Sequence, residues 1–249
     1  LIPLISSDGL LKNHELVSLT TIFKSSAFLI ANKDSWECKD MSWLLDRLCS
    51  VECPTEEQGE ELSSGTTPVI TAEDKPWVTS EVDNFVCLAL PDGHQQHPTV
   101  EFLSKAGVKA HGYSQGYRRP LIDLPGVAAK VIRPQDMPLQ VANENFDLAI
   151  TGRDWLRDHL YRFPSSPVRE LIDLGFGKIK LVAVVSKKLG VNNIDDLREL
   201  LEEGKLPGLR IASEYANIAD RYARDNHLSP YRVIPTWGAS EAFLPEDAD

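Results

Sequence analysis

Short apolar runs alternate with amphipathic stretches along residues 85–249, and this alternation restricts the fold more than any other feature of the sequence. The apolar runs have the length and the flanking turn residues of buried strands. They are 85–90, 128–132, 147–150, 180–185, 209–212 and 231–235. Helical periodicity marks the stretches 97–106, 138–143, 194–203 and 218–226. Such alternation predicts an α/β fold with mainly parallel strands, in which ligands bind at the carboxyl edge of the sheet.

The first 84 residues divide into two parts. Residues 1–50 hold a further apolar run at 27–31 and a helical stretch at 41–49. Residues 51–84 are rich in Glu, Ser, Thr and Pro, a composition typical of a flexible linker. We therefore expect folded sequence on both sides of an acidic linker.

Composition excludes several classes of protein. The formal net charge is −11, so the basic footprint of a nucleic-acid-binding protein is missing. No apolar run approaches the roughly 18 residues of a membrane span. The four cysteines, at positions 38, 49, 53 and 87, show no CxxC pair and no spacing typical of disulfides or zinc. We expect a cytoplasmic protein with neither nucleic acid nor membrane as a partner, and the sequence leaves any metal ligands unassigned.

The stretch FDLAITGRD at 146–154 is a candidate binding corner. A strand ends at Ile150, Thr151 and Gly152 form the turn, and Asp154 lies in the first turn of a helix. Glycine allows close approach of a ligand, and a helix N-terminus offers free N–H groups to an anion. The alternative is an ordinary strand–turn–helix corner in which Asp154 is a cap.

A second corner is RIASEYAN at 210–217. Ser213 and Asn217 have side chains that cap helices or bind phosphate, and Glu214 has a carboxylate suited to a ribose hydroxyl or a metal. Helix capping alone is the alternative.

Two further groups of residues suit anions. Arg118, Arg119 and Arg133 carry guanidinium groups that bind phosphate in a bidentate way, although a solvated basic turn remains the alternative. A loop of small residues precedes a helical stretch at 10–16 and resembles an anion-binding nest. The residues of this loop are Ser6, Ser7, Asp8 and Gly9.

Residues 85–249 resemble the catalytic part of the ATP phosphoribosyltransferases. The matching stretches are LALP at 88–91, PTVEFLSKAGV at 98–108, LPGVAAKVIRPQDMPLQVA at 124–142, FDLAITGRDWL at 146–156, DLGFGKIKLVAVV at 173–185, GLRIASEYANIADRYA at 208–223 and WGASEAFLPEDAD at 237–249. The family sequence that follows the last stretch is similar to residues 1–16 and to KSSAFLIANKDSW at 24–36 of this chain. The order therefore looks like a circular permutation, and a window cut across a tandem duplication would give the same order.

The resemblance implies a two-lobed fold like that of type II periplasmic binding proteins, with the ligand cleft between the lobes. Residues 1–50 and 85–175 would form lobe one, 51–84 the linker, and 176–249 lobe two. The implied reaction moves a phosphoribosyl group from phosphoribosyl pyrophosphate to N1 of ATP and releases pyrophosphate, with Mg²⁺ accompanying the donor. This is a glycosyltransferase reaction, the first step of histidine biosynthesis, and it depends on positioning and electrostatics rather than on a protein nucleophile.

The resemblance also implies the site residues. Those for the phosphoribosyl donor are Ser6, Ser7, Asp8, Gly9, Thr151, Gly152 and Asp154. Those for ATP are Arg118, Arg119, Arg133, Ser213, Glu214, Tyr215 and Asn217. A homo-oligomer and a separate regulatory subunit are the implied partners. Because the loop at 6–9 lacks the family's usual Thr-Gly-x-Thr signature, a noncatalytic nucleotide-binding or regulatory paralogue is the alternative.

Overall fold

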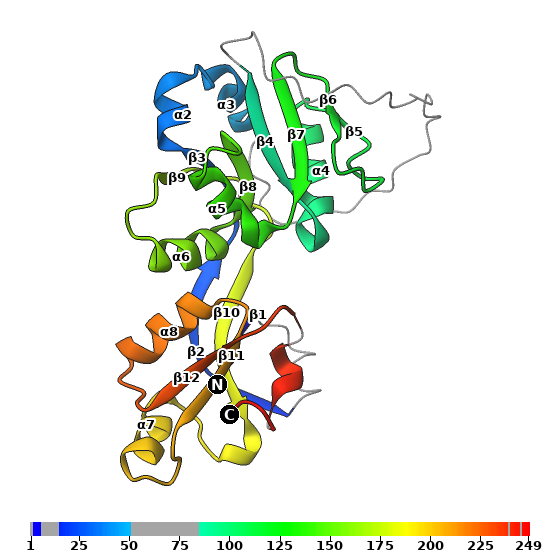
Figure 1. The fold of residues 1–249 in the computed structure, drawn as a ribbon. Helices are drawn as coiled ribbons and strands as arrows, with labels where there is room; N and C mark the ends of the chain where they lie inside the picture. Colours follow the sequence, from blue (N-terminus) through cyan, green and yellow to red (C-terminus); the bar gives the residue numbers. More distant parts are fainter. Residues whose placement is uncertain (1, 6–14, 51–84, 239, 245) are drawn as a thin grey trace.

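The structure, a computed structural model, describes residues 2–5, 15–50, 85–238, 240–244 and 246–249. Two α/β lobes are joined by a pair of strands that run from one lobe to the other (Figure 1). We call the lobe containing residues 27–50 and 85–173 the upper lobe, and the lobe containing 2–5, 16–25 and 179–249 the lower lobe. The expected two-lobed α/β fold is confirmed, while the linker at 51–84 lies outside the described residues.

The upper lobe is built on a five-stranded sheet in the order β7-β4-β8-β3-β9. Its strands are β7 (Val127–Ile132), β4 (Val86–Pro91), β8 (Leu148–Gly152), β3 (Ala27–Asn32) and β9 (Val168–Asp173). Strand β4 is parallel to β7 and β8, but β3 is antiparallel to β8 and β9. The prediction of mainly parallel strands thus holds for one half of this sheet. Strand β9 was not predicted, because it is an edge strand whose polar side chains interrupt any apolar run.

Short helices and a small hairpin surround this sheet. The helices are α2 (Lys33–Cys38), α3 (Ser42–Cys49), α4 (Gln96–Lys105), α5 (Met137–Ala142) and α6 (Arg153–Arg162), with 3-10 turns η1 (Gly93–Gln95) and η2 (Pro134–Asp136). The hairpin pairs β5 (Ala110–His111) with β6 (Leu121–Ile122). Pro134 and Pro138 occupy early helical positions, where the missing N–H group costs nothing.

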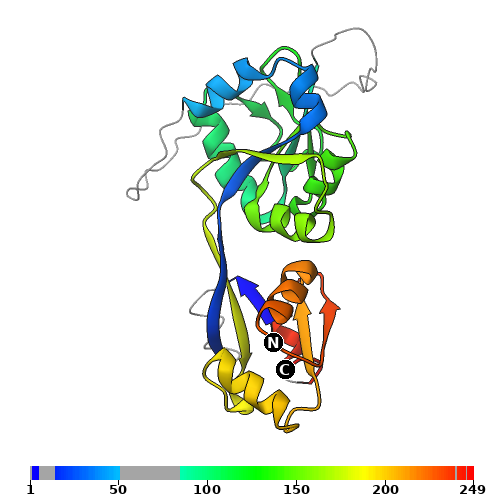
Figure 2. The ribbon, with the colours of Figure 1, turned by 90° about the vertical axis from the view of Figure 1, so that its left-hand side faces the viewer.

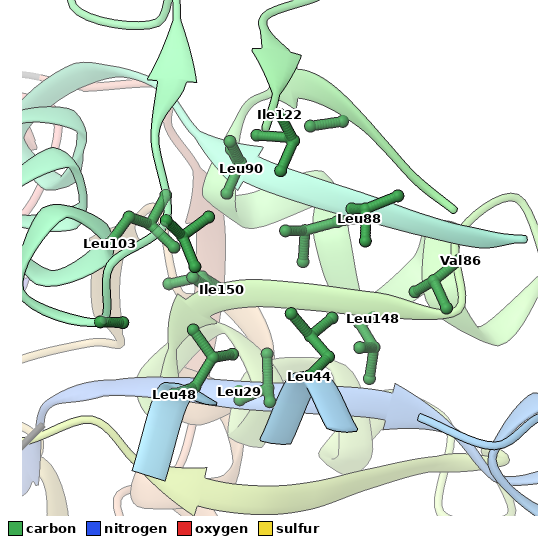
Figure 3. Packing of buried hydrophobic residues seen from close by; sticks show 14 of the residues in the cluster. Leu29, Leu44, Leu48, Val86, Leu88, Leu90, Leu103, Ile122, Leu148 and Ile150 are labelled. Atoms are coloured by element: carbon green, nitrogen blue, oxygen red, sulfur yellow. The ribbon is translucent and has the colours of Figure 1, made fainter. Parts of the chain in front are cut away.

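The start of the chain completes the core of the upper lobe. Leu29, Leu44 and Leu48 are buried against Leu148 and Ile150, as Figure 3 shows. All five side chains are almost fully excluded from solvent. Residues 27–50 therefore share one core with residues of 86–174, which follow the linker in the sequence.

The lower lobe contains two small sheets. In the first, β10 (Ile179–Ser186) lies between β1 (Ile2–Ile5) and β2 (Leu16–Ser25) and is antiparallel to both. In the second, β11 (Leu209–Ser213) and β12 (Tyr231–Pro235) are parallel. The helices are α7 (Ile194–Glu202) and α8 (Ala216–Asp225), with 3-10 turns η3 (Lys187–Leu189) and η4 (Ser240–Phe243).

The expected boundary of lobe one is wrong at the start of the chain. Residues 1–50 were assigned as a block to lobe one, yet β1 and β2 pair with β10 in the lower lobe. Leu16 is buried there beside Val182 and Ala212. The sequence LVSLTTIFKS of β2 is rich in β-branched and aromatic residues, a strand signal that the predicted helix at 10–16 obscured.

Strands β2 and β10 form the hinge between the lobes. Figure 2 shows them side by side along one edge of the molecule, while α6 and α8 face each other between the lobes. The register places Ser25 opposite Ile179 and Lys24 opposite Lys180. The hinge therefore places Lys24 and Ser25 next to the end of the upper lobe that faces the lower lobe.

Candidate functional site

The corner between β8 and α6 requires a glycine for space rather than for backbone conformation. Gly152 has φ −71°, which any residue adopts. A Cβ at this position would overlap the Oδ1 atom of Asp154 and lie 3.1 Å from Nε2 of Gln95. The missing side chain therefore lets a carboxylate and an amide pack directly against the backbone.

Asp154 joins three segments through hydrogen bonds. Its side chain is buried, with 2% of the residue exposed. Oδ1 accepts from the Ser25 hydroxyl at 2.5 Å, and Oδ2 accepts from the Tyr215 hydroxyl at 2.6 Å. Ser25 comes from the hinge and Tyr215 from the lower lobe, so one carboxylate connects both lobes and the hinge. Burial and the negative charge of Asp154 raise the pKa of Tyr215, which keeps the phenol protonated as a donor.

Asp158, one helical turn further along α6, binds the start of α8 in the opposite lobe. Its carboxylate accepts from the backbone N–H groups of Asn217 and Ile218, both at 2.9 Å, and from Nδ2 of Asn217 at 2.6 Å. Burial raises the pKa of Asp158, although these hydrogen bonds lower it. The first-turn N–H groups of α8 are thus bound by a residue of the other lobe.

This arrangement corrects the expected capping of α8. The Ser213 hydroxyl accepts from the Tyr215 N–H at 2.9 Å and makes a local turn. Asn217 lies inside the first turn and donates to Asp158. The indole of Trp155 packs on the ring of Tyr215, with 4.2 Å between ring centroids.

The N-terminus of α6 also differs from expectation, because its first N–H groups are not free. The Arg153 N–H donates to the Ser26 carbonyl at 3.0 Å, and the Asp154 N–H donates to the Ser25 hydroxyl at 2.9 Å. Both partners belong to the end of the hinge strand β2. The neighbouring Thr151 is fully buried, and its hydroxyl donates to the Pro134 carbonyl at 3.0 Å.

The three predicted arginines lie at the surface. Nη1 of Arg118 donates to Oδ2 of Asp92 at 2.8 Å, and its carbonyl accepts from the Val131 N–H at the edge of the upper sheet. Arg133 directly precedes Pro134, the partner of Thr151, and is therefore the arginine tied most closely to the corner. Ser6, Ser7, Asp8 and Gly9 lie outside the described residues.

Three residues of this site were not predicted from the sequence: Ser25, Gln95 and Asp158. Gln95 is only 3% exposed, and its Oε1 atom has no hydrogen-bond partner in the described part of the chain. Such an unpaired buried oxygen costs about 1–3 kcal/mol and indicates a position where a polar ligand group would bind. The sequence gave no warning, since a glutamine in the polar stretch DGHQQ looks exposed.

We call Ser25, Gln95, Gly152, Asp154 and Tyr215 the Asp154 cluster. Its members are hydrogen-bond donors and acceptors held on rigid elements, without a cysteine or histidine among them. Within the described ranges, no group of three or more His, Cys, Asp or Glu residues is placed to hold a metal ion. These groups are suited to binding and orienting polar ligands.

Comparison with known proteins shows similarity over the part of the chain that holds Gly152, Asp154 and Tyr215. The family model described as "HisG: ATP phosphoribosyltransferase" matches residues 133–249, which include α6 and α8. The ATP phosphoribosyltransferases of Saccharolobus solfataricus and Prosthecochloris aestuarii are each 32% identical to the chain, over 166 and 167 residues. These alignments cover 63% and 65% of this chain and 53% and 51% of the relatives. The chain thus spans about half the length of the curated relatives it matches.

Solved structures match the chain only with low overall similarity. An ATP phosphoribosyl transferase (HisG:HisZ) complex from Thermotoga maritima has a TM-score of 0.42 and 19% identity, over 66% of this chain and 71% of that chain. The arginine-, lysine-, histidine-binding protein ArtJ from Geobacillus stearothermophilus has a TM-score of 0.34 and 11% identity, over 89% and 66%. Because these TM-scores are low, the description of the fold depends on the strand topology of the chain alone. Over residues 133–249, the chain is similar to the ATP phosphoribosyltransferase family.

Proposed function

We propose that this chain transfers a phosphoribosyl group from phosphoribosyl pyrophosphate to N1 of ATP, releasing pyrophosphate in the first step of histidine biosynthesis. One observation carries the proposal. Residues 151–154 and 213–217, implied as donor and ATP residues by the family resemblance, come from different lobes and meet through the hydrogen bond between Asp154 and Tyr215. Both segments lie in the part of the chain that the family model matches.

The reaction needs positioning more than protein nucleophiles. N1 of the adenine attacks C1 of the ribose while the C1–O bond to pyrophosphate breaks, and the bonding electrons leave with pyrophosphate. Holding the two substrates in line lowers the barrier, because their translational freedom is lost on binding rather than in the chemical step. A lobe on each side of the substrates would hold them in this way. The buried Asp154 carboxylate accepts from hydroxyl groups, and ribose hydroxyls of the donor fit the same acceptor.

Gln95 and the aromatic pair extend this assignment. The unpaired Oε1 of Gln95 would accept from a donor group of the bound substrate. The partly buried indole of Trp155, packed on the buried ring of Tyr215, would offer a flat ring to a sugar or base. Arg133 would neutralise triphosphate charge at the rim of the same corner.

Magnesium fits this site as an ion bound mainly by the donor. Mg²⁺ usually keeps several waters and uses one or two carboxylates together with substrate phosphates. Asp154 would be the protein ligand of such an ion if its oxygens were released from Ser25 and Tyr215. When bound, the ion neutralises charge on the leaving pyrophosphate.

The wider assignments belong to the same proposal. We infer a homo-oligomer working with a separate regulatory subunit, as the family resemblance implies. We infer a cytoplasmic setting as well. Within the described ranges, no helix has the length and apolar character needed to cross a bilayer. Residues 2–5 and 15–50 complete both lobes although they precede the acidic linker, and this order of elements supports a permuted or tandem origin.

A turnover assay tests the proposal. The protein is mixed with ATP, phosphoribosyl pyrophosphate and Mg²⁺, and pyrophosphate and phosphoribosyl-ATP are measured with and without the donor. We expect donor-dependent formation of both products. Asp154→Asn should lower kcat/KM about 100-fold because it removes a positioned charge, whereas Asp225→Asn, at an exposed position of α8, should leave it unchanged.

The alternative function predicts a different result. If ATP binds but neither product forms, with or without an added regulatory subunit, the chain is a noncatalytic nucleotide-binding paralogue. Turnover that survives Asp154→Asn at the wild-type rate would show that the Asp154 cluster is not the site.

A further inference from the structure

We propose that the hinge carries a second site, separate from the Asp154 cluster, that binds a small phosphate-bearing anion. A cavity of about 540 Å³ opens where the two hinge strands meet the upper lobe. Its lining residues are Lys24, Ser25, Ser26, Arg153, Asp173, Lys178, Ile179 and Lys180. Ser25 also belongs to the Asp154 cluster, whereas the proposed transferase reaction uses none of the three lysines of this cavity.

The charges around the cavity are unbalanced. Four lining residues are basic and one is acidic. Arg153 is paired with Glu170, since Nε donates to Oε1 at 3.0 Å. Among the described residues, no ion pair involves Lys24, Lys178 or Lys180. Three unpaired lysines thus surround one cavity in a chain whose formal net charge is −11.

The single acidic residue is already engaged by neutral groups. Oδ1 of Asp173 accepts from the Ser26 hydroxyl at 2.8 Å and from the Gly175 N–H at 2.9 Å. These bonds tie the carboxylate to the loop that follows β9 rather than to a lysine. The cavity therefore keeps a net positive charge.

Strand register forces two of the lysines together. Lys24 and Lys180 are directly opposite each other in the antiparallel pair of β2 and β10. Opposed residues of such a pair extend their side chains on the same face, and like charges in this position destabilise the sheet. An anion bound between the two ammonium groups would remove this repulsion.

The same register separates this site from the Asp154 cluster. The Ser25 side chain reaches Asp154, which lies between the lobes. Successive side chains of a strand point to opposite faces, so Lys24 lies on the other face of the hinge. The two sites are thus back to back across one strand.

The chemistry favours phosphate over a carboxylate ligand. Lysine ammonium groups act as point charges for phosphate, and three of them suit an anion with at least two negative charges. The overall negative field repels such anions at long range, so affinity would come from this local group alone. Free phosphate and the phosphate of a nucleotide share this chemistry.

An NMR titration of the full chain tests the site. Inorganic phosphate, AMP and adenosine are added in separate titrations while backbone amide shifts are recorded. We expect shifts at residues 24–26 and 178–180 with phosphate and with AMP, but not with adenosine. Equal affinities for phosphate and AMP would show that the site recognises the phosphate group alone. Tighter binding of AMP would show that the site recognises a nucleotide.

Paired variants give the decisive comparison. Lys24→Gln/Lys180→Gln should weaken phosphate binding about tenfold or more, because two of three charges are lost. The control Lys187→Gln/Lys188→Gln, which removes two exposed charges at η3, should change it less than about twofold. If the first variant fails to fold, Lys178→Gln alone replaces it. Shifts confined to 213–217, or equal phosphate affinity in the Lys24/Lys180 variant and in the Lys187/Lys188 control, would overturn the proposal whether or not the chain is a transferase.

Discussion

The carboxylate of Asp158 and the backbone N–H of Asn217 form a 2.9 Å hydrogen bond between helices of different lobes. A helix start normally binds a side chain that directly precedes it in the sequence. Here the bound carboxylate comes from the facing helix, so lobe contact and the order of the first turn of α8 depend on each other.

Asp158→Ala should therefore weaken the contact between the lobes and destabilise the first turn of α8. The loss of the carboxylate leaves two N–H groups of α8 without their partner, which costs about 1–2 kcal/mol of unfolding free energy. Small-angle scattering should show a larger radius of gyration as the lobes separate. The exposed Asp225→Ala is the control. An unchanged radius of gyration in Asp158→Ala would mean that other contacts hold the lobes together.

Gly152→Ala should disturb the Asp154 cluster without straining the backbone. The added methyl group overlaps Oδ1 of Asp154 and must displace the carboxylate from Ser25 and Tyr215. We expect a loss of about 1–3 kcal/mol in stability and about 100-fold in the proposed turnover.

The matched control for this substitution is Gly208→Ala. A Cβ there would lie 3.6 Å from the Pro230 carbonyl, an ordinary contact. Turnover of Gly152→Ala at the level of Gly208→Ala would show that the position of Asp154 does not matter.

His159 should make stability depend on pH. Burial, with a smaller effect from Arg162, lowers the pKa of His159 below its usual 6.5, while its Nε2 atom lies 2.8 Å from the Ser166 hydroxyl. As pH falls below 6.5, the unfolded chain binds a proton before the native state does, so the unfolding free energy falls. The contribution of His159 to the unfolding free energy is fully present above pH 6.5 and is lost as the pH falls through the lower pKa of the native state.

His159→Gln removes that titration and keeps a hydrogen-bonding group near Ser166. Urea unfolding at about pH 7.5 and about pH 5.5 should show a smaller loss of stability for His159→Gln than for the wild type. His111→Gln, at an exposed position, should keep the wild-type difference. Equal differences in all three proteins would contradict the assignment.

Lys39→Met should weaken the attachment of the chain start to the upper lobe. The Lys39 ammonium donates to both carboxylate oxygens of Asp147 at 2.9 Å, and Asp147 is nearly buried. Removing the ammonium leaves that carboxylate underpaired, at a cost of about 1.5–3 kcal/mol in urea unfolding. Lys105→Met, at the exposed end of α4, should cost far less.

The sequence predicted the local parts of this site. Thr151, Gly152 and Asp154 follow a buried apolar run, and Ser213 follows another, so strand–turn–helix corners were expected there and are present. Seven predicted strands are confirmed, because their mainly apolar runs pair with neighbouring strands in the sheets. The local sequence pattern was sufficient to predict these strands and corners, because their own side chains determine their structure.

Partners from distant segments were not predictable in this way. Asp158 looks like an ordinary polar residue of a surface helix until α8 faces it. Ser25 gains its role only because β2 ends beside α6. Gln95 is buried by neighbours rather than by its own hydrophobicity. Each of these roles is set by tertiary contact, which a single-sequence pattern does not encode.

Strand β3 lies in the interior of the upper sheet, between β8 and β9, although it precedes both by a long stretch of chain. During synthesis this strand leaves the ribosome with both hydrogen-bonding edges open and an entirely buried-type sequence, AFLIAN. Its partners follow only after the linker, β4 and β7 have been made. Unpaired apolar strands are sites of aggregation, and pairing over such a separation is slow. In the nascent chain, β3 therefore stays unpaired until β8 and β9 have been made.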